Sequence, residues 1–367
     1  MPTHIRSIVR IKGNYAILYK WKSIVLKIVY LLNQYSLINS IITDMHDYPT
    51  LEQIKQTKER LGTLIQETPA HHWRDPRLSK QLGEKTEVFV KLELLQVTGT
   101  FKPRGALNVM LNLSSSQLKQ GVTAVSAGNH AIATAYAARA LGTSAKVVMP
   151  KSANPLRMKL SKEMGAELEL VESALEAFDR VKQIEKEEGR SFIHPFEGPL
   201  TLQGTGTAGF EFSKQVPKLD AMILPIGGGG LCGGFAAALK QVWPDIKIYG
   251  VEPEGANSMF QSFQLGEPVT LDHIQTIADS LAPPKAEPYT YSVCRQFVDE
   301  IVLVDDRQLK DAMRHLFYGI KLAVEPAGAA STAGLLGPLK EKIKGKRAGI
   351  IACGSNIDIK DFHKLIS

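Results

Sequence analysis

The sequence predicts an α/β fold in which parallel β-sheets are covered by helices. From residue 122 onward, short apolar runs of strand length alternate with longer helix-like stretches. Glycine-rich or polar motifs directly follow several of these apolar runs. The composition, 44% hydrophobic and 22% charged residues, is ordinary for a globular protein. Right-handed crossovers would gather those motifs at the carboxyl ends of the strands, where ligands bind.

The first 48 residues differ in character from the rest. Residues 1–44 hold six basic residues and one acidic residue, so residues 45–367 carry only +2 of the total net charge of +7. The apolar run at 24–32 contains a lysine and is shorter than the roughly 20 residues of a membrane span. We expect residues 1–48 to be a non-catalytic, dispensable extension, with translation starting at Met45 as one explanation. An amphipathic helix on a membrane surface is the alternative.

The charge distribution and the cysteine spacing argue against several classes of protein. The nearly neutral body has no basic stripe interleaved with aromatic residues, which argues against nucleic acid as a partner. Cys232, Cys294 and Cys353 lack CxxC spacing and form an odd count. They therefore indicate neither a disulfide framework nor a zinc site, and they suit a reducing, cytoplasmic location.

Ordered structure is expected from Pro49 onward. Thr50 and Gln53 form a capping-box pattern for a helix that Gly62 can end, and a strand-like run follows at 87–93. The later alternation of strands and helices predicts βαβ units. The expected strands are 122–125, 145–149, 168–171, 221–226, 246–251, 301–304 and 348–352; the expected helices are 131–140, 156–164, 231–242 and one that begins near Asp306.

Lys102 lies at a junction between the strand-like run 87–93 and a helix-like stretch at 105–110. A lysine that forms an imine needs a mostly apolar pocket, because desolvation lowers its pKa and frees the amine lone pair. The neighbouring Phe101 can supply part of that apolar wall. Most lysines are solvated surface residues, so this interpretation depends on the motifs elsewhere in the chain.

Gly227–Gly230 and Leu231 follow a strand-like run and open a helix. Backbone N–H groups at such a helix start point toward an anion, and glycines let the anion approach closely. The same stretch also fits GxGxxG, and Glu252 lies where a dinucleotide site places its ribose-binding acid. An NAD-dependent dehydrogenase is therefore a remote alternative, but it leaves Lys102 unexplained.

Ser126–His130 connects another strand to a helix. The Ser126 hydroxyl, the Asn129 amide and the N–H groups of a helix N-terminus suit a carboxylate, although an ordinary capped helix would look the same. Two later stretches, Glu325–Ala329 and Cys353–Asp358, join this set. Alone, Glu325 would be a capping or ion-pairing residue and Cys353 an inert buried thiol.

Together these motifs resemble those of fold-type II pyridoxal-phosphate enzymes, the tryptophan synthase β-like group, and within it the serine/threonine dehydratases and serine racemases. The resemblance covers nearly all of residues 49–367. It implies that pyridoxal 5′-phosphate is the cofactor and that Lys102 bonds to it and acts as the catalytic base. It also implies two parallel-sheet α/β domains, a small one at 116–197 inserted in a large one formed by 49–115 and 198–367.

The resemblance assigns the other site residues as well. Asn129 would hydrogen-bond the 3′ oxygen of the cofactor, Glu325 would lie near its pyridine ring and Cys353 would touch the pyridine nitrogen. A thiol cannot hold that nitrogen protonated, which suits β-elimination. Further cofactor contacts would come from Phe101, Gly227, Gly228, Gly229, Gly230 and Leu231, and substrate contacts from Thr98, Ser126, Ala127, Asn129 and His130.

Two departures from serine racemases bear on the reaction. In those enzymes a serine hydroxyl stands at the position matching Ala127 and serves as the second acid/base, a role that a methyl group cannot fill. Ser258 stands where their divalent-metal segment has an aspartate, which weakens a Mg²⁺ or Ca²⁺ site near Glu252. Whether a cation binds there stays open.

We therefore expect a lyase that converts L-threonine, L-serine or both to a 2-oxo acid and ammonium by α,β-elimination. A serine racemase on the same scaffold is the nearer alternative. We expect a homodimer or homotetramer in the cytoplasm that binds a small hydroxy-amino acid and neither nucleic acid nor a membrane. The chain ends nine residues after Asp358, so we expect no regulatory domain and no feedback inhibition by isoleucine.

Overall fold

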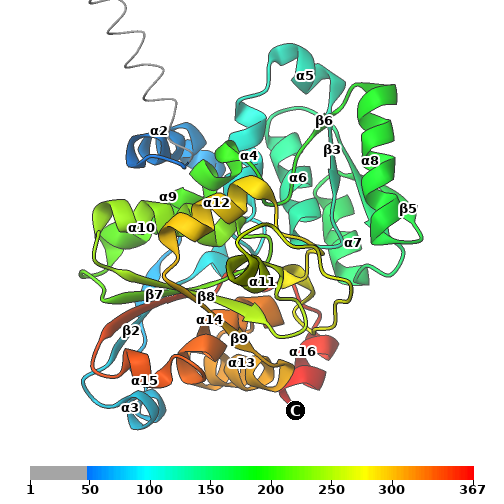
Figure 1. The fold of residues 1–367 in the computed structure, drawn as a ribbon. Coiled ribbons are helices and arrows are strands. Elements are labelled where there is room, and N and C mark those ends of the chain that lie inside the picture. Colours follow the sequence, from blue (N-terminus) through cyan, green and yellow to red (C-terminus); the bar gives the residue numbers. More distant parts are fainter. Residues whose placement is uncertain (1–47) are drawn as a thin grey trace, which may run out of the picture. The chain divides into compact units, whose positions relative to one another are not determined.

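Two β-sheets organise residues 48–367, the part of the chain that the computed structural model describes (Figure 1). The six-stranded sheet has the order β1-β2-β10-β7-β8-β9, and the four-stranded sheet has the order β5-β4-β3-β6. The larger sheet comprises β1 (Ala70–His72), β2 (Glu87–Lys91), β10 (Arg347–Ile351), β7 (Ala221–Pro225), β8 (Lys247–Pro253) and β9 (Glu300–Val304). The smaller sheet comprises β5 (Glu167–Val171), β4 (Ala145–Pro150), β3 (Val122–Val125) and β6 (Ser191–Phe192).

Every pair of neighbouring strands is parallel except β1 and β2, which run antiparallel. The α/β class predicted from the sequence is confirmed, but the larger sheet is mixed rather than purely parallel. The sequence analysis missed β1 and β6, which have only three and two residues. Runs of that length carry no readable periodicity, so only their partners in the fold define them as strands.

Helices flank both sheets. The first group is α2 (Leu51–Leu61), α3 (Pro76–Leu82), α4 (Pro103–Leu111), α5 (Ser115–Gln120), α6 (Asn129–Ala140), α7 (Pro155–Glu163), α8 (Ala174–Glu188) and α9 (Pro199–Gln215). The second is α10 (Gly230–Val242), α11 (Ser258–Leu265), α12 (Pro288–Phe297), α13 (Asp306–Ile320), α14 (Pro326–Leu336), α15 (Lys340–Ile343) and α16 (Ile359–Ile366). Three short 3₁₀ helices are η1 (Gly62–Leu64), η2 (Glu93–Leu95) and η3 (Asp279–Leu281).

The larger sheet is buried on both faces, which explains why its strands are apolar at consecutive positions. In β2, Val88 and Val90 belong to a core shared with α13 and α14, whereas Phe89 belongs to a second core shared with α9, α10 and α12. The strand β7 divides in the same way, with Ile223 in the first core and Met222 in the second. Neighbouring residues of a strand point to opposite faces, so both faces demand apolar side chains.

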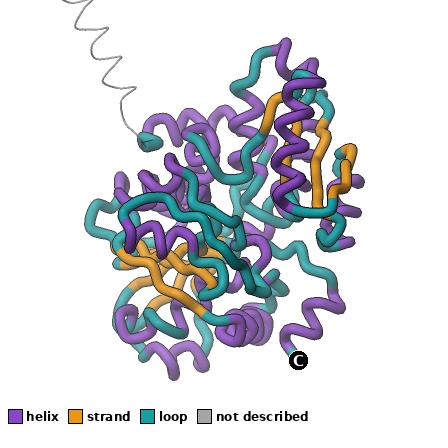
Figure 2. The backbone as a smooth tube through the Cα atoms, turned by 45° about the vertical axis from the view of Figure 1, so that its right-hand side comes forward, coloured by secondary structure: helices purple, strands orange, loops and turns teal. Residues whose placement is uncertain are grey.

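The four-stranded sheet and the helices α6, α7 and α8 that pack on it form what we call the small lobe; the rest of residues 48–367 is the large lobe. Figure 2 shows the strands of the two sheets as separate groups. All four strands of the small lobe come from residues 122–192, within the interval expected for an inserted domain. Residues 48–367 nevertheless form one compact unit, and the domain boundaries at 116 and 197 stay a prediction.

The helix α2 begins as the sequence predicted. Thr50 Oγ1 accepts the Gln53 N–H at 3.2 Å, and Gln53 Oε1 accepts the Thr50 N–H at 2.9 Å. The expectations for the extension, its Met45 start and a membrane-surface helix concern residues 1–47, which lie outside the described residues. From residue 48 to the end, no helix combines the length and the apolar character needed to cross a bilayer.

Candidate active site

Lys102 lies at the N-cap position of α4, where the chain leaves the carboxyl end of the larger sheet. A bridge between Thr100 and Gly354 and a 3.3 Å hydrogen bond from the Phe101 N–H to the Cys353 carbonyl fix this segment beside the end of β10. The Lys102 Nζ is 5.3 Å from the centre of the Phe101 ring, as an apolar wall requires. Burial lowers the pKa of the Lys102 amine to about 8, which brings its neutral form within physiological reach.

A buried network of four charged side chains holds the segment that carries Lys102. Arg104 Nε and Nη2 donate to Glu93 at 2.8 and 2.9 Å, and Nη1 and Nη2 donate to Glu211 at 2.8 and 2.7 Å. Lys91 Nζ donates to Glu211 at 3.0 Å. Two positive and two negative charges balance, and η2, α4, α9 and β2 are joined behind the site. Such bidentate pairing fixes geometry as well as charge.

The Gly227–Gly230 loop lies between β7 and the N-terminus of α10. Gly229 has a φ of 88°, a left-handed conformation that favours glycine. A Cβ on Gly228 would overlap the Phe196 ring, and one on Gly230 would overlap the Phe196 backbone, so neither position has room for a side chain. The loop thus opens backbone N–H groups toward a cavity at a helix N-terminus, an arrangement that binds phosphate.

That cavity, which we call the inner cavity, lies beside Lys102. It brings together residues from seven separate stretches of the sequence. Those residues include Phe101, Lys102, Asn129, Gly227, Gly228, Gly229, Gly230, Leu231, Glu325 and Cys353. Every cofactor-binding residue expected from the sequence therefore lines one space.

Asn129 opens the helix α6 and faces Glu325 across the lobes. Its Nδ2 donates to Glu325 Oε1 at 2.6 Å, and its Oδ1 accepts from Asn356 Nδ2 at 2.8 Å. Just before it, the Gly128 N–H donates to Ser126 Oγ at 3.0 Å. The Ser126–Gly128 hydrogen bond therefore shapes the start of this loop, and the bonds to Glu325 and Asn356 hold Asn129 in place.

His130 is buried beside Lys102 as a neutral imidazole. Burial, with the charge of Lys102 as a second cause, lowers its pKa to about 3. Its Nε2 lies 2.8 Å from the Ile193 carbonyl oxygen, so this nitrogen carries the proton. A second imidazole, His194, has its pKa lowered to about 4, again first by burial and then by Lys102. His194 also lines a small cavity together with Lys102.

Glu325 and Cys353 complete the polar side of the inner cavity. Burial raises the pKa of the Glu325 carboxyl, and the Arg157 guanidinium opposes that effect. Burial also raises the pKa of the Cys353 thiol, whose Sγ donates to the Ala327 carbonyl at 3.5 Å. A neutral thiol is a weak hydrogen-bonding partner. The Cys353 thiol therefore suits an aromatic ring whose nitrogen is not protonated.

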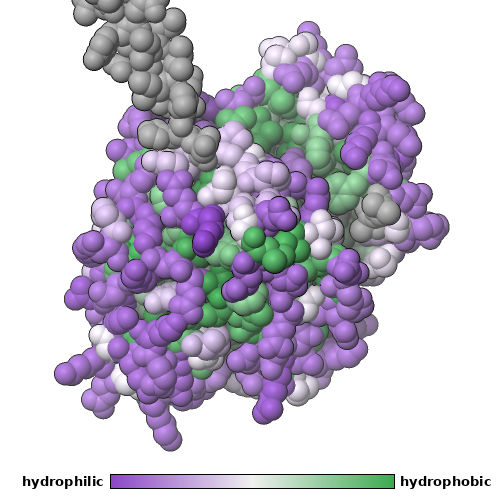
Figure 3. Space-filling model, viewed as in Figure 1, coloured by the Kyte–Doolittle hydropathy of each residue, from purple (hydrophilic) through white to green (hydrophobic). Residues whose placement is uncertain are grey.

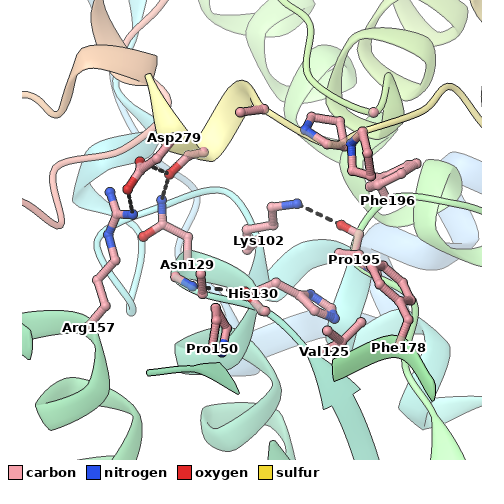
Figure 4. A pocket seen from close by; sticks show the side chains of 18 of the residues that line it. Lys102, Val125, Asn129, His130, Pro150, Arg157, Phe178, Pro195, Phe196 and Asp279 are labelled. Atoms are coloured by element: carbon pink, nitrogen blue, oxygen red, sulfur yellow. Dashed lines mark hydrogen bonds and ion pairs between the residues drawn. The ribbon is translucent and has the colours of Figure 1, made fainter. Parts of the chain in front are cut away.

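A larger space, the outer cavity, lies next to the inner one and shares Lys102 and Asn129 with it. Ser126, Ala127, Asn129 and His130 line it with Lys102. Figure 4 shows Arg157 and Asp279 on one side of Lys102 and Phe178 and Phe196 on the other. The sequence analysis named none of those four residues, because they belong to no motif and lie far apart in the chain.

Thr98 and Glu252 are placed differently from their expected roles. Thr98 lines none of the three cavities around Lys102; its carbonyl accepts from Asn356 Nδ2 at 2.9 Å, and its substrate role stays a prediction. Both oxygens of the buried Glu252 accept backbone N–H groups, those of Met259 at 3.0 Å and Phe260 at 2.6 Å. The Glu252 carboxylate is therefore engaged by the start of α11, so it is not free for a ribose hydroxyl. Residues 48–367 contain no cluster of three His, Cys, Asp or Glu side chains suited to a metal.

The residues present fit pyridoxal phosphate. The Gly227–Gly230 loop would hold the phosphate, Lys102 would bond to the aldehyde, and Asn129, Glu325 and Cys353 would face the ring. The observation that tests this fit is the glycine loop, where side chains at Gly228 and Gly230 are sterically excluded beside a buried amine of lowered pKa.

Comparison with known proteins agrees with this geometry. Residues 62–354 match the family model described as "Pyridoxal-phosphate dependent enzyme". A phenylserine dehydratase of Ralstonia pickettii is 48% identical over 88% of this chain and 97% of its own length. An L-threonine ammonia-lyase of Thermotoga maritima is 35% identical over 87% of this chain and 78% of its own. The solved structure of maize serine racemase superposes with a TM-score of 0.80 at 33% identity, over 86% of this chain and 96% of that one.

Proposed function

Since the chain belongs to the pyridoxal-phosphate-dependent enzyme family, we propose that it is a dehydratase that converts a β-hydroxy-α-amino acid to a 2-oxo acid and ammonium. The observation that carries the proposal is the placement of the buried Lys102 amine in one space with both the glycine loop and the Ser126–His130 loop. L-Threonine and L-serine are the simplest substrates of this class. Relatives of this chain bear the names of dehydratases and ammonia-lyases.

The residues divide the work as follows. Ser126, Asn129 and the N-terminus of α6 hold the substrate carboxylate, which fixes the α-carbon near Lys102. Pyridoxal phosphate, when bound, would supply an aldehyde for the substrate amine and an electron sink for the α-carbon. The Lys102 amine removes the α-proton, as its lowered pKa permits. The β-hydroxyl leaves with a proton as water, and the released enamine hydrolyses to the 2-oxo acid and ammonium.

Racemisation is the nearer rival, since a serine racemase of Schizosaccharomyces pombe is 37% identical to this chain. It requires a second acid/base on the face opposite the lysine. Ala127 lines the outer cavity and offers only a methyl group. Ser126 does not replace it, because we assign its hydroxyl to the substrate carboxylate; that hydroxyl also accepts the Gly128 N–H. Elimination is therefore the outcome that these residues favour.

The outer cavity supports a substrate with an apolar β-substituent larger than methyl. Phe178, Phe196, Pro150 and Val125 contribute apolar walls, and Figure 4 places the two phenyl groups opposite Arg157. A phenyl substituent would pack against those rings, whereas a second carboxylate would lose its hydration there. The relative from R. pickettii is named for phenylserine, which has such a substituent. We therefore include 3-arylserines among the proposed substrates.

Turnover of a substrate panel tests the proposal. Purified protein supplied with pyridoxal phosphate should show a visible absorbance band and release 2-oxo acid from L-threonine, L-serine and L-threo-phenylserine. L-threo-3-hydroxyaspartate should react far more slowly. The Lys102→Ala variant is the control and should release none. A protein without the band, or with D-serine as its main product, would contradict the proposal.

Assembly and location complete the proposal. We propose a homodimer or homotetramer in the cytoplasm. Apolar side chains gather near the middle of the face drawn in Figure 3, and Leu265 on α11 is 70% exposed, which supports contact between copies. Cys232, Cys294 and Cys353 are all unpaired, as a reducing compartment favours. Light scattering of the protein as it elutes from a size-exclusion column measures its molar mass. A monomer at micromolar concentration would contradict the proposed assembly.

A further inference from the structure

Arg157 is a buried arginine that crosses from one lobe to the other. It lies on α7 in the small lobe, yet its guanidinium contacts three segments of the large lobe. Nη1 donates to Asp279 Oδ2 at 2.7 Å, Nη2 to Glu325 Oε2 at 3.2 Å, and Nε to the Asn356 carbonyl at 3.1 Å. Its side chain is only 6% exposed, so these bonds replace water almost completely.

The Ser126–His130 loop leaves room for this guanidinium. A Cβ on Gly128 would lie 3.0 Å from Arg157 Nη1 and 3.1 Å from its Cδ. Any larger residue at 128 would therefore press on the arginine. The φ of Gly128 is −161°, an extended conformation open to all residues, so the close approach and not the backbone explains the glycine.

Arg157 and Asn129 belong to one closed ring of hydrogen bonds, in which Glu325 and Asn356 each connect the two. Glu325 receives Arg157 on Oε2 and Asn129 on Oε1, so one carboxylate connects the two side chains. Asn356 receives Arg157 on its carbonyl and donates its side-chain amide to Asn129 Oδ1. Two of the side chains that hydrogen-bond the Asn129 amide are thus themselves held by Arg157; a further one, Ser280, accepts from Asn129 Nδ2 at 3.4 Å.

We propose that Arg157 is a positioning residue that acts through Glu325 and Asn356 to orient Asn129 toward the bound cofactor, and that it does so only when the small lobe lies against the large lobe. The interlobe character follows from its bonds, all three of which reach the large lobe. Separation of the lobes would release Glu325 and Asn356 together. The inference rests on the cofactor placement in the proposed function.

The charge balance at Glu325 provides a measurable readout. Four titratable groups interact with its carboxylate: Arg157, Asp279, Lys102 and the Cys353 thiol; Asn129 and Ser280 add hydrogen bonds. Burial raises the pKa of Glu325, and Arg157 is the foremost group that opposes this. Without the guanidinium, Glu325 would take up its proton at a higher pH. Any cofactor absorbance that depends on the Glu325 charge would then titrate at a higher pH.

The test compares Arg157→Met, Arg157→Lys and a control, Lys159→Met, on the same helix. Lys159 is 71% exposed and pairs only with the surface residue Glu163 at 3.8 Å. In the Arg157→Met holoenzyme, the acid-side midpoint of the visible band should move to higher pH, and kcat should fall about 10- to 100-fold with a smaller change in KM. Arg157→Lys should recover part of both effects, and Lys159→Met should match the wild type.

A double variant shows whether Arg157 acts through Glu325. In the Glu325→Gln background, Arg157→Met should leave the pH midpoint unchanged and add less to the kcat loss than it causes alone. A full additional loss, a change confined to KM, or a wild-type midpoint in Arg157→Met would overturn the inference. If Arg157→Met does not fold, Arg157→Lys carries the same comparisons. A wild-type protein without the visible band would instead refute the proposed function.

Discussion

The Lys102 Nζ donates to the backbone carbonyl oxygen of Pro195 at 2.6 Å (Figure 4). Pro195 lies just after the small-lobe strand β6, so this bond connects the large-lobe lysine to the small-lobe strand's end. The bond holds the side chain in the site. It also engages a donor rather than the lone pair, so it leaves the neutral amine ready to attack.

The first prediction concerns the pH at which apoprotein captures its cofactor. Only a neutral amine bonds to an aldehyde, and burial lowers the pKa of Lys102 from 10.5 to about 8. The capture rate should therefore rise through pH 8 and level off above pH 9. Stopped-flow absorbance after mixing apoprotein with pyridoxal phosphate measures it, and a midpoint near 10.5 would contradict the burial effect. Borohydride followed by peptide mapping should place the cofactor on Lys102.

The second prediction concerns Ala127. A serine hydroxyl at this position would supply an acid/base on the face opposite Lys102. Ala127→Ser should therefore release D-serine from L-serine while the wild type releases only elimination product. Chiral chromatography of both reactions measures the ratio. Ser126→Ala is the matched control and should weaken substrate binding without any D-serine; D-serine from the wild type would reject the assignment.

The third prediction concerns the charge network behind the site. Glu211→Gln removes the partner shared by Arg104 and Lys91, all of which are buried. Breaking a buried ion pair costs about 3–5 kcal/mol, because one charge stays buried without compensation. Urea unfolding should show a loss of that size. Lys218→Ala, which removes a surface pair with Asp245, should change the free energy of unfolding by no more than about 1 kcal/mol.

The fourth prediction concerns stability in acid. The pKa of His130 is lowered to about 3, whereas an unfolded histidine titrates near 6.5. Between these two pKa values the unfolded chain binds a proton at His130 and the folded chain does not. The contribution of His130 to stability is therefore lost as pH falls from 6.5 toward 3. The slope from one such group approaches about 1.4 kcal/mol per pH unit. His130→Gln should make the decline between pH 6 and pH 4 shallower in urea titrations; an unchanged slope would show that His130 already titrates normally.

Much of the site could be predicted because its residues follow the carboxyl ends of strands in the sequence. Lys102, Asn129 and the glycine loop each lie where a strand gives way to a helix, and parallel topology brings such junctions together. Local chemistry drew attention to each of them but left an alternative open for each one. The resemblance added the identity of the cofactor, which no single motif specifies.

Arg157 could not be predicted, because its partners lie 122, 168 and 199 residues further along the chain. Nothing in the sequence of α7 distinguishes it from a solvated arginine. The apolar walls at Phe178 and Phe196 could not be predicted for the same reason, because the position of each ring depends on how the small lobe packs. Glu252 shows the opposite case: its spacing from the glycines allowed the remote dehydrogenase alternative, but the backbone of α11 occupies both of its oxygens.

The pairing of β2 with β10 has a consequence for biosynthesis. Residues 87–91 lie beside residues 347–351 in the larger sheet, with register from Glu87 opposite Arg347 to Lys91 opposite Ile351. At about 5–20 residues per second, a ribosome needs roughly 10–50 s to make the second strand after the first. The small sheet is complete by Phe192, so we infer that the small lobe folds on the nascent chain while β2 still lacks its neighbour. Limited proteolysis of chains stalled near residue 250 would reveal a protected core at 122–192, and the absence of such a core would refute that order. Until β10 emerges, the edge of β2 that pairs with it presents unpaired backbone N–H and C=O groups.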